Sequence, residues 1–303
     1  MNGNNDNDID LVDIFNLLWS KKLFIVLITL SISLISIFYA LNLPNYYKSE
    51  ALLSMRDAEQ SQGLSAVSQY GGLAQMAGIS IPKTGGENKS QYVIATIKSR
   101  DFFNELTAAN PSIVPMLYAV KEYDHKKKIA IYDSAIYDQK NKIWKTAKPT
   151  QLQAHKIFVG SALSISKNDL TGYLSVSIEH LSPIFSYKLL LNVIDKLNDI
   201  ARVKDLSESE KALNFLFEQS SKTDLIGIAA SINNLIEAQI QKQMSTQISK
   251  DYLVYYLDSP FIPELKSKPS RSTICILGFL FGFSLSILIT LIREFIFNKE
   301  RLK

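Results

Sequence analysis

The stretch LFIVLITLSISLISIFYALNL, residues 23–43, is the first of two uncharged apolar runs that decide the fold of this chain. The second, ICILGFLFGFSLSILITLI, occupies residues 274–292. A helix of about 20 apolar residues spans the roughly 30 Å hydrocarbon core of a bilayer, and both runs have that length. The sequence therefore predicts a membrane-spanning helix near each end of the 303 residues. A buried helix of a soluble protein is the alternative for either run alone.

A cleaved signal peptide is a second alternative for the first run. Its flank is basic only at Lys21 and Lys22, and the preceding tail carries several aspartates: Asp6, Asp8, Asp10 and Asp13. The run is longer than the apolar part of a signal peptide, and Phe38 stands where a cut after Ala40 needs a small residue. We expect an uncleaved anchor, preceded by an interfacial helix containing Leu11, Phe15, Leu18 and Trp19.

Basic residues predict the orientation in the membrane. They follow the second run at Arg293, Lys299, Arg301 and Lys303 and precede the first at Lys21 and Lys22, although Lys266, Lys268 and Arg271 weaken the contrast. Because positive residues stay on the cytoplasmic side, both termini are expected there. The predicted divisions are a cytoplasmic tail at 1–22, a membrane helix at 23–43, an extracytoplasmic domain at 44–273, a second membrane helix at 274–292 and a cytoplasmic tail at 293–303.

Gly278 and Gly282 form a GxxxG pair in the second run, and such a pair permits the close approach of another membrane helix. They are candidate helix-packing residues. Glycine is also common in membrane helices that pack against nothing in particular, so plain tolerance of glycine is the other interpretation.

The first part of the intervening domain mixes strand and helix signals. Pro44 ends the first membrane helix, and residues 46–55 have the composition of a strand. Residues 60–90 are rich in Gly, Ser and Ala, which predicts a loop with one short helix at 73–77. Helical spacing of apolar residues then predicts a helix over 92–106, ended by Asn110-Pro111.

A hairpin and a long helical pair are predicted next. Residues 157–179 alternate as two strands around a turn at 167–172. Ser182 and Pro183 then supply a helix N-cap and a first-turn proline. Apolar positions recur at helical spacing until Gln219, lapse, and resume at Leu225, so we expect an antiparallel, coiled-coil-like pair with its turn at 219–224. Ser207 and Glu210 form a possible capping box, but a continuous first helix is favoured.

The end of the intervening domain is predicted to return toward the second anchor. Residues 252–257 are expected to form a strand that pairs with residues 46–55. Three prolines, Pro260, Pro263 and Pro269, then stiffen the approach to the second membrane run.

Composition and motifs give little support to catalysis. The formal net charge of +4 is small, and the sequence contains no long basic stripe. Both features argue against nucleic acid as a partner. The scattered histidines His125, His155 and His180 give no metal-ligand spacing, and the only cysteine, Cys275, lies in an apolar run. Residues 83–90 depart from a phosphate loop at both required glycines. Asp133 and Asp138 are most simply surface acids, and the basic run 125–128 a solvated face, although it is able to attract anionic sugars or lipid headgroups.

The layout resembles the polysaccharide chain-length determinant (Wzz) family over nearly the whole chain. The resemblance is carried by IDLVDI at 9–14, PNYYKSEA at 44–51, GLAQMAGI at 72–79, IKSRDFF at 97–103, TGYLSVSIEHLSP at 171–183, and the proline-rich ending from Asp258-Ser259-Pro260 to Ser270-Arg271. Each piece is short, but their order and spacing together are specific.

The resemblance implies an α+β membrane protein of the bacterial inner membrane, with a periplasmic α/β base, a long protruding helical hairpin and protomers assembled as a ring. It implies a non-catalytic co-polymerase, without cofactor or metal, that acts with a separate polymerase on lipid-linked polysaccharide such as lipopolysaccharide O-antigen. Since only residues 293–303 follow the second run, kinase activity is not expected. Gln219, Lys222 and Asp224 are the candidate periplasmic contact surface. The alternative is a membrane adaptor for capsule or exopolysaccharide export that works with a separate tyrosine kinase.

Overall fold

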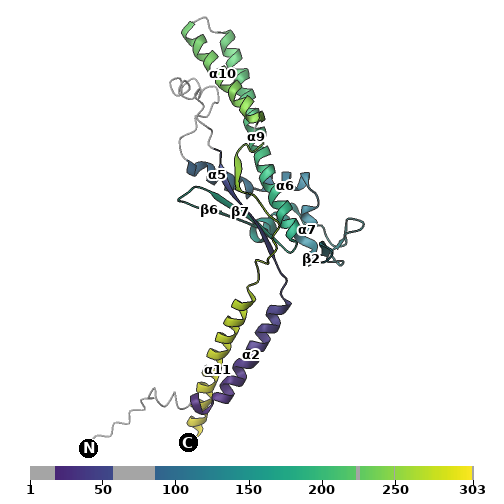
Figure 1. Ribbon diagram of the computed structural model, residues 1–303, viewed down its shortest axis with the longest axis vertical. Coiled ribbons are helices and arrows are strands. Elements are labelled where there is room, and N and C mark those ends of the chain that lie inside the picture. Colours follow the sequence, from purple (N-terminus) through teal and green to yellow (C-terminus); the bar gives the residue numbers. More distant parts are fainter. Residues whose placement is uncertain (1–17, 57–85, 223–225, 249, 302–303) are drawn as a thin grey trace, which may run out of the picture. The chain divides into compact units, whose positions relative to one another are not determined.

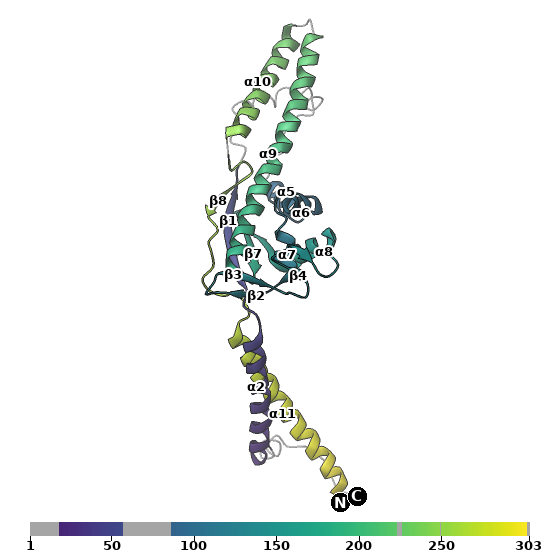
Figure 2. The ribbon, with the colours of Figure 1, turned by 90° about the vertical axis from the view of Figure 1, so that its right-hand side faces the viewer.

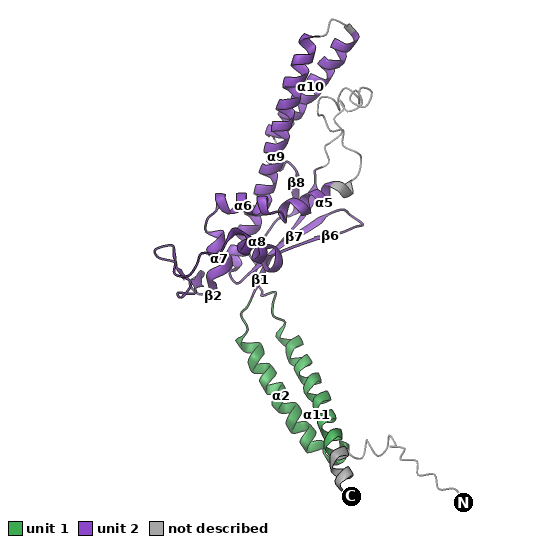
Figure 3. Ribbon diagram, turned by 180° about the vertical axis from the view of Figure 1, so that it is seen from behind, with its two compact units in different colours: residues 1–45, 267–303 green, residues 46–266 purple. Residues whose placement is uncertain are grey.

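The computed structural model describes residues 18–56, 86–222, 226–248 and 250–301, and it divides into two compact units (Figure 3). Unit 1 comprises residues 1–45 and 267–303, and unit 2 comprises residues 46–266. The predicted loop at 60–85 and its short helix at 73–77 lie outside the described residues, as does most of the interfacial helix.

Unit 1 is a pair of long apolar helices, α2 (Lys22–Asn42) and α11 (Arg271–Arg301), which lie side by side (Figure 1). Each contains a segment long and apolar enough to cross a membrane, Lys22–Asn42 and Arg271–Arg293. These segments match the two predicted runs within a few residues. The helix α11 continues to Arg301, so most of the predicted C-terminal tail is helical.

Unit 2 is built on a four-stranded antiparallel sheet in the order β6-β7-β1-β8. The central strands are β1 (Tyr47–Met55) and β7 (Leu174–His180), and the outer strands are β6 (Leu163–Lys167) and β8 (Val254–Asp258). Alternate residues of β1 and β7 are buried and face each other in register, as Ala51 does with Val176. The predicted pairing of the returning strand with the first strand is confirmed.

The long helix α9 (Pro183–Ser221) packs on the sheet with its first half and against α10 (Ile226–Ile248) with its second half (Figure 2). Ser182 caps α9 by accepting a hydrogen bond from the Phe185 N–H at 3.3 Å, as predicted. The helix is continuous through Ser207 and Glu210, which confirms the favoured interpretation. It also continues through Gln219 to Ser221, so the predicted turn begins later than expected.

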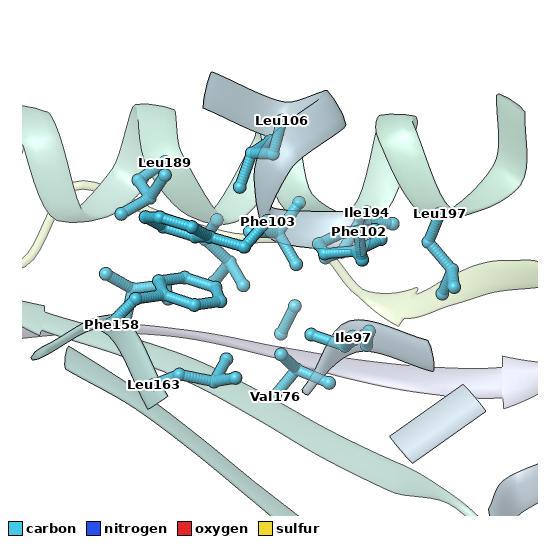
Figure 4. Packing of buried hydrophobic residues seen from close by; sticks show 14 of the residues in the cluster. Ile97, Phe102, Phe103, Leu106, Phe158, Leu163, Val176, Leu189, Ile194 and Leu197 are labelled. Carbon is cyan, nitrogen blue, oxygen red and sulfur yellow. The ribbon is translucent and has the colours of Figure 1, made fainter. Parts of the chain in front are cut away.

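Short helices complete the core beside α9. These are α5 (Gly86–Ile97), α6 (Arg100–Ala109), α7 (Ile113–Ala119), α8 (Gln151–Ile157) and the π-helix η1 (Phe158–Ala162). Phe103 of α6 and Phe158 of η1 are fully buried with ring centroids 5.2 Å apart, and they lie beneath Leu189 of α9 (Figure 4). The largest buried cluster among the described residues therefore joins these helices to the sheet.

Three predicted boundaries are wrong. The helix expected over 92–106 is two helices, because Ser99 is extended and its hydroxyl caps α6 through the Phe102 N–H at 3.1 Å. Residues 86–90, expected in a loop, form the first turns of α5. The first strand of the hairpin begins at Leu163 rather than Ile157, because a capping box of Thr150 and Gln153 starts α8 and the chain stays helical through Ala162.

Two small hairpins between α7 and α8 were not predicted. The first joins β2 (Val120–Asp124) to β3 (Ile129–Tyr132), and the second joins β4 (Tyr137–Asp138) to β5 (Ile143–Trp144). Each forms its own two-stranded sheet. Aromatic contacts connect them, with the rings of Tyr132 and Tyr137 5.3 Å apart.

Candidate functional site

Small and hydroxyl-bearing residues line the contact between the two helices of unit 1. The Thr29 hydroxyl donates a hydrogen bond to the Ser286 hydroxyl at 3.3 Å, and the Ser36 hydroxyl donates to the Ile274 carbonyl at 3.1 Å. Thr29 and Ser286 are both buried between the helices. In an apolar surrounding, such contacts let two helices approach closely and satisfy their polar side chains.

Both glycines of the GxxxG pair lie on the face of α11 that contacts α2. A Cβ atom added to Gly278 would collide with the Ser36 side chain. A Cβ atom added to Gly282 would lie 3.0 Å from the Ile32 Cβ and 3.4 Å from the Thr29 carbonyl oxygen. The backbones are thus close at both glycines, and their role as helix-packing residues in a membrane stays a prediction.

A leucine at Gly282 is expected to separate α2 from α11. We predict that a Thr29→Cys/Ser286→Cys pair in a Cys275→Ser background forms a disulfide under mild oxidation, because the two native hydroxyls are 3.3 Å apart. Adding Gly282→Leu should lower the yield severalfold, whereas Phe281→Leu, at a largely exposed position, should leave it unchanged. Equal yields with and without Gly282→Leu would contradict the observed packing.

The buried Asn198 fixes the long helix to the last strand. Its side-chain oxygen accepts hydrogen bonds from the backbone N–H groups of Leu253 at 2.8 Å and Val254 at 3.0 Å, and its side-chain nitrogen donates to the Val254 carbonyl at 3.1 Å. The Asn198 amide therefore joins the long helix to the start of β8.

Polar contacts continue along the helical pair above the sheet. The Ser209 hydroxyl donates to the Gln239 side-chain oxygen at 2.9 Å, and both residues are buried. Tyr252 donates to the Asp205 carboxylate at 2.6 Å, and burial together with this bond raises the pKa of Tyr252 to about 12. Farther out, the pair is closed by a small apolar cluster of Leu216, Ile232 and Leu235. These contacts make the pair a defined projection of unit 2.

The predicted contact residues lie near the end of this projection. Lys222 is exposed, caps α9 and forms an ion pair with Glu218 at 2.6 Å. Gln219 is half-buried in the last turn of α9, and Asp224 lies outside the described residues. Their role as a contact surface stays a prediction.

Large apolar side chains are exposed on the same helical pair. They are Val203 and Phe217 on α9, and Ile228, Ile240, Met244 and Ile248 on α10. Helices of a monomeric soluble protein usually turn such residues toward a core. Their exposure in one chain is expected when the pair contacts another protein surface.

His180 at the end of β7 is buried and neutral. Its Nδ1 accepts a hydrogen bond from the Ser182 N–H at 3.0 Å, and its Nε2 donates to the Met116 carbonyl at 2.9 Å. Burial lowers the pKa of His180 to about 4, because the cationic imidazolium loses its hydration. The histidine thus joins α7 to the start of α9.

Acidification is expected to destabilise unit 2 through His180. An unfolded histidine has a pKa near 6.5, so the unfolded chain binds more protons between pH 6.5 and about 4. Its contribution to stability is complete above pH 6.5 and falls by about 3 kcal/mol toward pH 4. Thermal unfolding of the wild type and of His180→Gln across this range should show a steeper fall for the wild type, and parallel curves would contradict the assignment.

The other candidate chemical groups serve structure. Asp133 accepts a hydrogen bond from the Ala135 N–H at 2.9 Å, and Asp138 accepts from the Lys140 N–H at 3.0 Å, so both acids stabilise turns. His125 contacts the Tyr47 hydroxyl, and His155 contacts the Lys98 carbonyl, each at 2.9 Å. Within the described ranges, no three His, Cys, Asp or Glu side chains are placed to hold a metal ion.

The chain has two apolar helices long enough to span a membrane and a mixed α/β unit that carries a long helix pair. These features define the class as an α+β protein with two candidate membrane anchors. A sequence model of the Wzz family, described as chain length determinant protein, matches residues 7–109. This match confirms the resemblance to the polysaccharide chain-length determinant family and covers α2, the first candidate anchor, together with β1, α5 and α6.

The solved structures that are similar to the chain include two polysaccharide co-polymerases. A full-length bacterial polysaccharide co-polymerase matches with 12% sequence identity and a TM-score of 0.44, covering 95% of this chain and 99% of that one. A fragment of WzzB, a polysaccharide co-polymerase from Salmonella Typhimurium, matches with 14% identity and a TM-score of 0.28, covering 74% of this chain and 100% of the fragment. No curated protein sequence matches the chain.

Proposed function

We propose that the whole chain is a polysaccharide co-polymerase that regulates the chain length of lipopolysaccharide O-antigen or a related surface polysaccharide. The observation that carries this proposal is the match of residues 7–109 to the chain length determinant family. The architecture beyond residue 109 supports it, because the α9–α10 pair and the second apolar helix complete the layout that the resemblance implies.

The protein acts in the bacterial inner membrane with both termini in the cytoplasm and residues 44–273 in the periplasm. This orientation is supported by Lys21 and Lys22 at the start of the first apolar segment and by Arg293 at the end of the second. The growing lipid-linked polysaccharide and an integral-membrane polymerase would then meet unit 2 on the periplasmic side.

Copies of the chain assemble into a ring that serves as a scaffold, without chemistry of its own. The exposed apolar residues of the helical pair, such as Phe217 and Met244, support self-association, because their burial between protomers removes apolar surface from water. Gln219, Lys222 and Asp224 are proposed to contact the polymerase or the glycan. No cofactor is required for such a role.

Deletion of the gene is expected to leave polysaccharide synthesis active but to broaden the distribution of chain lengths. A scaffold that only measures the product is dispensable for the polymerisation reaction itself. Gel electrophoresis of surface polysaccharide from the deletion strain, with the plasmid-borne gene as a control, measures the distribution. Complete loss of polymer would contradict the proposal.

Replacing residues 293–303 by a neutral linker in a plasmid copy of the gene distinguishes two functions. These are length control by a scaffold and service as a membrane adaptor for a cytoplasmic kinase. A scaffold retains length control provided that the second helix still inserts, which membrane fractionation checks. An adaptor that signals through its tail loses function, and that result would favour capsule or exopolysaccharide export.

A further inference from the structure

The two unpredicted hairpins of unit 2 carry the same short sequence. Tyr-Asp-x-Lys-x-Lys-Ile occurs at residues 123–129 and again at residues 137–143. The first copy spans the turn between β2 and β3, and the second spans the turn between β4 and β5. We call residues 120–148, which contain both copies, the hairpin lobe.

The two turns are built alike. Asp124 accepts hydrogen bonds from the N–H groups of Lys126 and Lys127 at 2.9 and 3.0 Å. Asp138 accepts in the same way from Lys140 and Asn141 at 3.0 and 3.2 Å. Both aspartates are therefore engaged in organising a turn that presents lysines.

The last lysine of each turn has a left-handed backbone. Lys128 and Lys142 both have φ of 55°. This conformation favours glycine and costs another residue about 1 kcal/mol. Lysine bears this cost at both positions, and it presents an ammonium group at the same place in the two turns.

Aromatic packing makes the lobe a preformed platform. The Tyr137 ring lies 5.3 Å from that of Tyr132 in the first hairpin and 5.0 Å from that of Trp144 in the second. A surface hollow is lined by residues of both hairpins, including Ile129, Tyr132, Lys140 and Lys145. The two basic turns are thus held in a fixed relation to each other.

Isoleucines are exposed directly beside the lysines. Ile129 is 50% exposed and Ile143 is 60% exposed, and each follows a left-handed lysine. The exposed lysines of the lobe are Lys121, Lys126, Lys127, Lys128, Lys140, Lys142, Lys145 and Lys148. Exposed apolar side chains flanked by ammonium groups are typical of surfaces that bind the interface of an anionic bilayer.

A short tether limits the distance between the lobe and the end of the first apolar helix. His125 of the first turn contacts the Tyr47 hydroxyl at 2.9 Å, and their rings are 5.2 Å apart. Only residues 43–46 separate Tyr47 from Asn42, the last residue of α2. The five backbone steps from Asn42 to Tyr47 span at most about 18 Å. Covalent connection alone therefore keeps the first basic turn within reach of the membrane surface at which α2 ends.

We propose that the hairpin lobe docks on anionic phospholipid headgroups beside the first membrane helix, with its lysines on the phosphates and Ile129 and Ile143 in the interface. An acidic glycan would attract the lysines but would gain little from the exposed isoleucines. The short tether to α2 also favours lipid. This inference goes beyond length regulation and needs only a membrane anchor.

Lipid quenching of a fluorophore tests the docking in the full chain. An Ile129→Cys or Ile143→Cys variant in a Cys275→Ser background is labelled with an environment-sensitive dye and placed in nanodiscs with brominated acyl chains. Quenching is expected in discs that contain phosphatidylglycerol, and less in pure phosphatidylcholine or at high salt. A label at Leu170→Cys, the 97% exposed tip of the β6–β7 hairpin, serves as the control and should not be quenched.

The variant Lys128→Gly/Lys142→Gly separates folding from binding. Glycine suits the left-handed turns, so the melting temperature should not fall. The ratio of docked to undocked lobe should fall about 25-fold, since each lysine near an anionic surface contributes about fivefold. Lys211→Gln/Lys242→Gln removes the same charge from exposed positions of α9 and α10 and should leave docking unchanged.

Three results would overturn the proposal. The first is the absence of quenching at residues 129 and 143, and the second is equal quenching in both lipids. The third is shielding of the labels by a soluble acidic polysaccharide without lipid quenching, which would assign the lobe to glycan. Because no polymerase is present, none of these results depends on chain-length control.

Discussion

Replacing Asn198 with alanine is expected to destabilise unit 2 by about 4 kcal/mol, because two backbone N–H groups and one carbonyl of the β8 segment lose their partner. Asn198 is 3% exposed, so water does not readily replace the lost amide. Thermal unfolding of the purified full chain in detergent measures the loss. Hydrogen exchange should locate it in β8 and the adjoining part of β1.

Asn214→Ala is the matched control for this prediction, since Asn214 is an exposed asparagine of the same helix. Its substitution should change stability by less than about 0.5 kcal/mol. If both variants unfold alike, α9 and β8 are not held together by the Asn198 side chain.

Replacing Phe103 with alanine is expected to cost about 4 kcal/mol, because a fully buried ring is removed from the centre of the core. Its ring contacts those of Phe158 and His155, with centroids 5.2 and 5.7 Å away. Those neighbours belong to α8 and η1, so a cavity here loosens two elements at once. Denaturation of the full chain in detergent should show a lower midpoint.

Leu170→Ala provides the comparison for Phe103, because Leu170 is 97% exposed at the tip of the β6–β7 hairpin. Its substitution should leave the unfolding of unit 2 nearly unchanged. A destabilisation below about 1 kcal/mol for Phe103→Ala would place the core elsewhere.

Strong local signals made much of the fold predictable from the sequence. The uncharged runs correspond to α2 and α11, and the Ser182-Pro183 pair marks the start of α9. The returning strand pairs with the first strand as expected. These features depend on length, capping or alternation, and each signal is contained in a short stretch.

The middle of the chain was much less predictable, because its elements are short and are fixed by tertiary contacts. The strands β4 and β5 have two residues each, too few for a periodic pattern. The Thr150 and Gln153 capping box was a readable signal for α8 that the prediction missed. At Ser99, a serine inside an apolar helical pattern became a cap, which the pattern alone did not indicate.

The candidate site was predicted in part. The glycine spacing favours a close approach of helices, and an added Cβ at Gly278 or Gly282 would meet α2, but their role as helix-packing residues stays a prediction. Asn198 had no distinguishing mark in the sequence, because one polar residue on a helix is ordinary and its partners lie more than 50 positions away. The repeat Tyr-Asp-x-Lys-x-Lys-Ile is visible in the sequence, but the prediction used only the basic run at 125–128 and missed it.

The side of the membrane on which unit 2 lies tests the central claim most directly. Leu170→Cys and Lys303→Cys are made separately in a Cys275→Ser background and treated with a membrane-impermeant thiol reagent after the outer membrane is permeabilised. The account predicts that the cysteine at 170 reacts while the inner membrane is intact. The cysteine at 303 should react only after the cells are lysed. Protection of residue 170 until lysis would contradict a periplasmic co-polymerase.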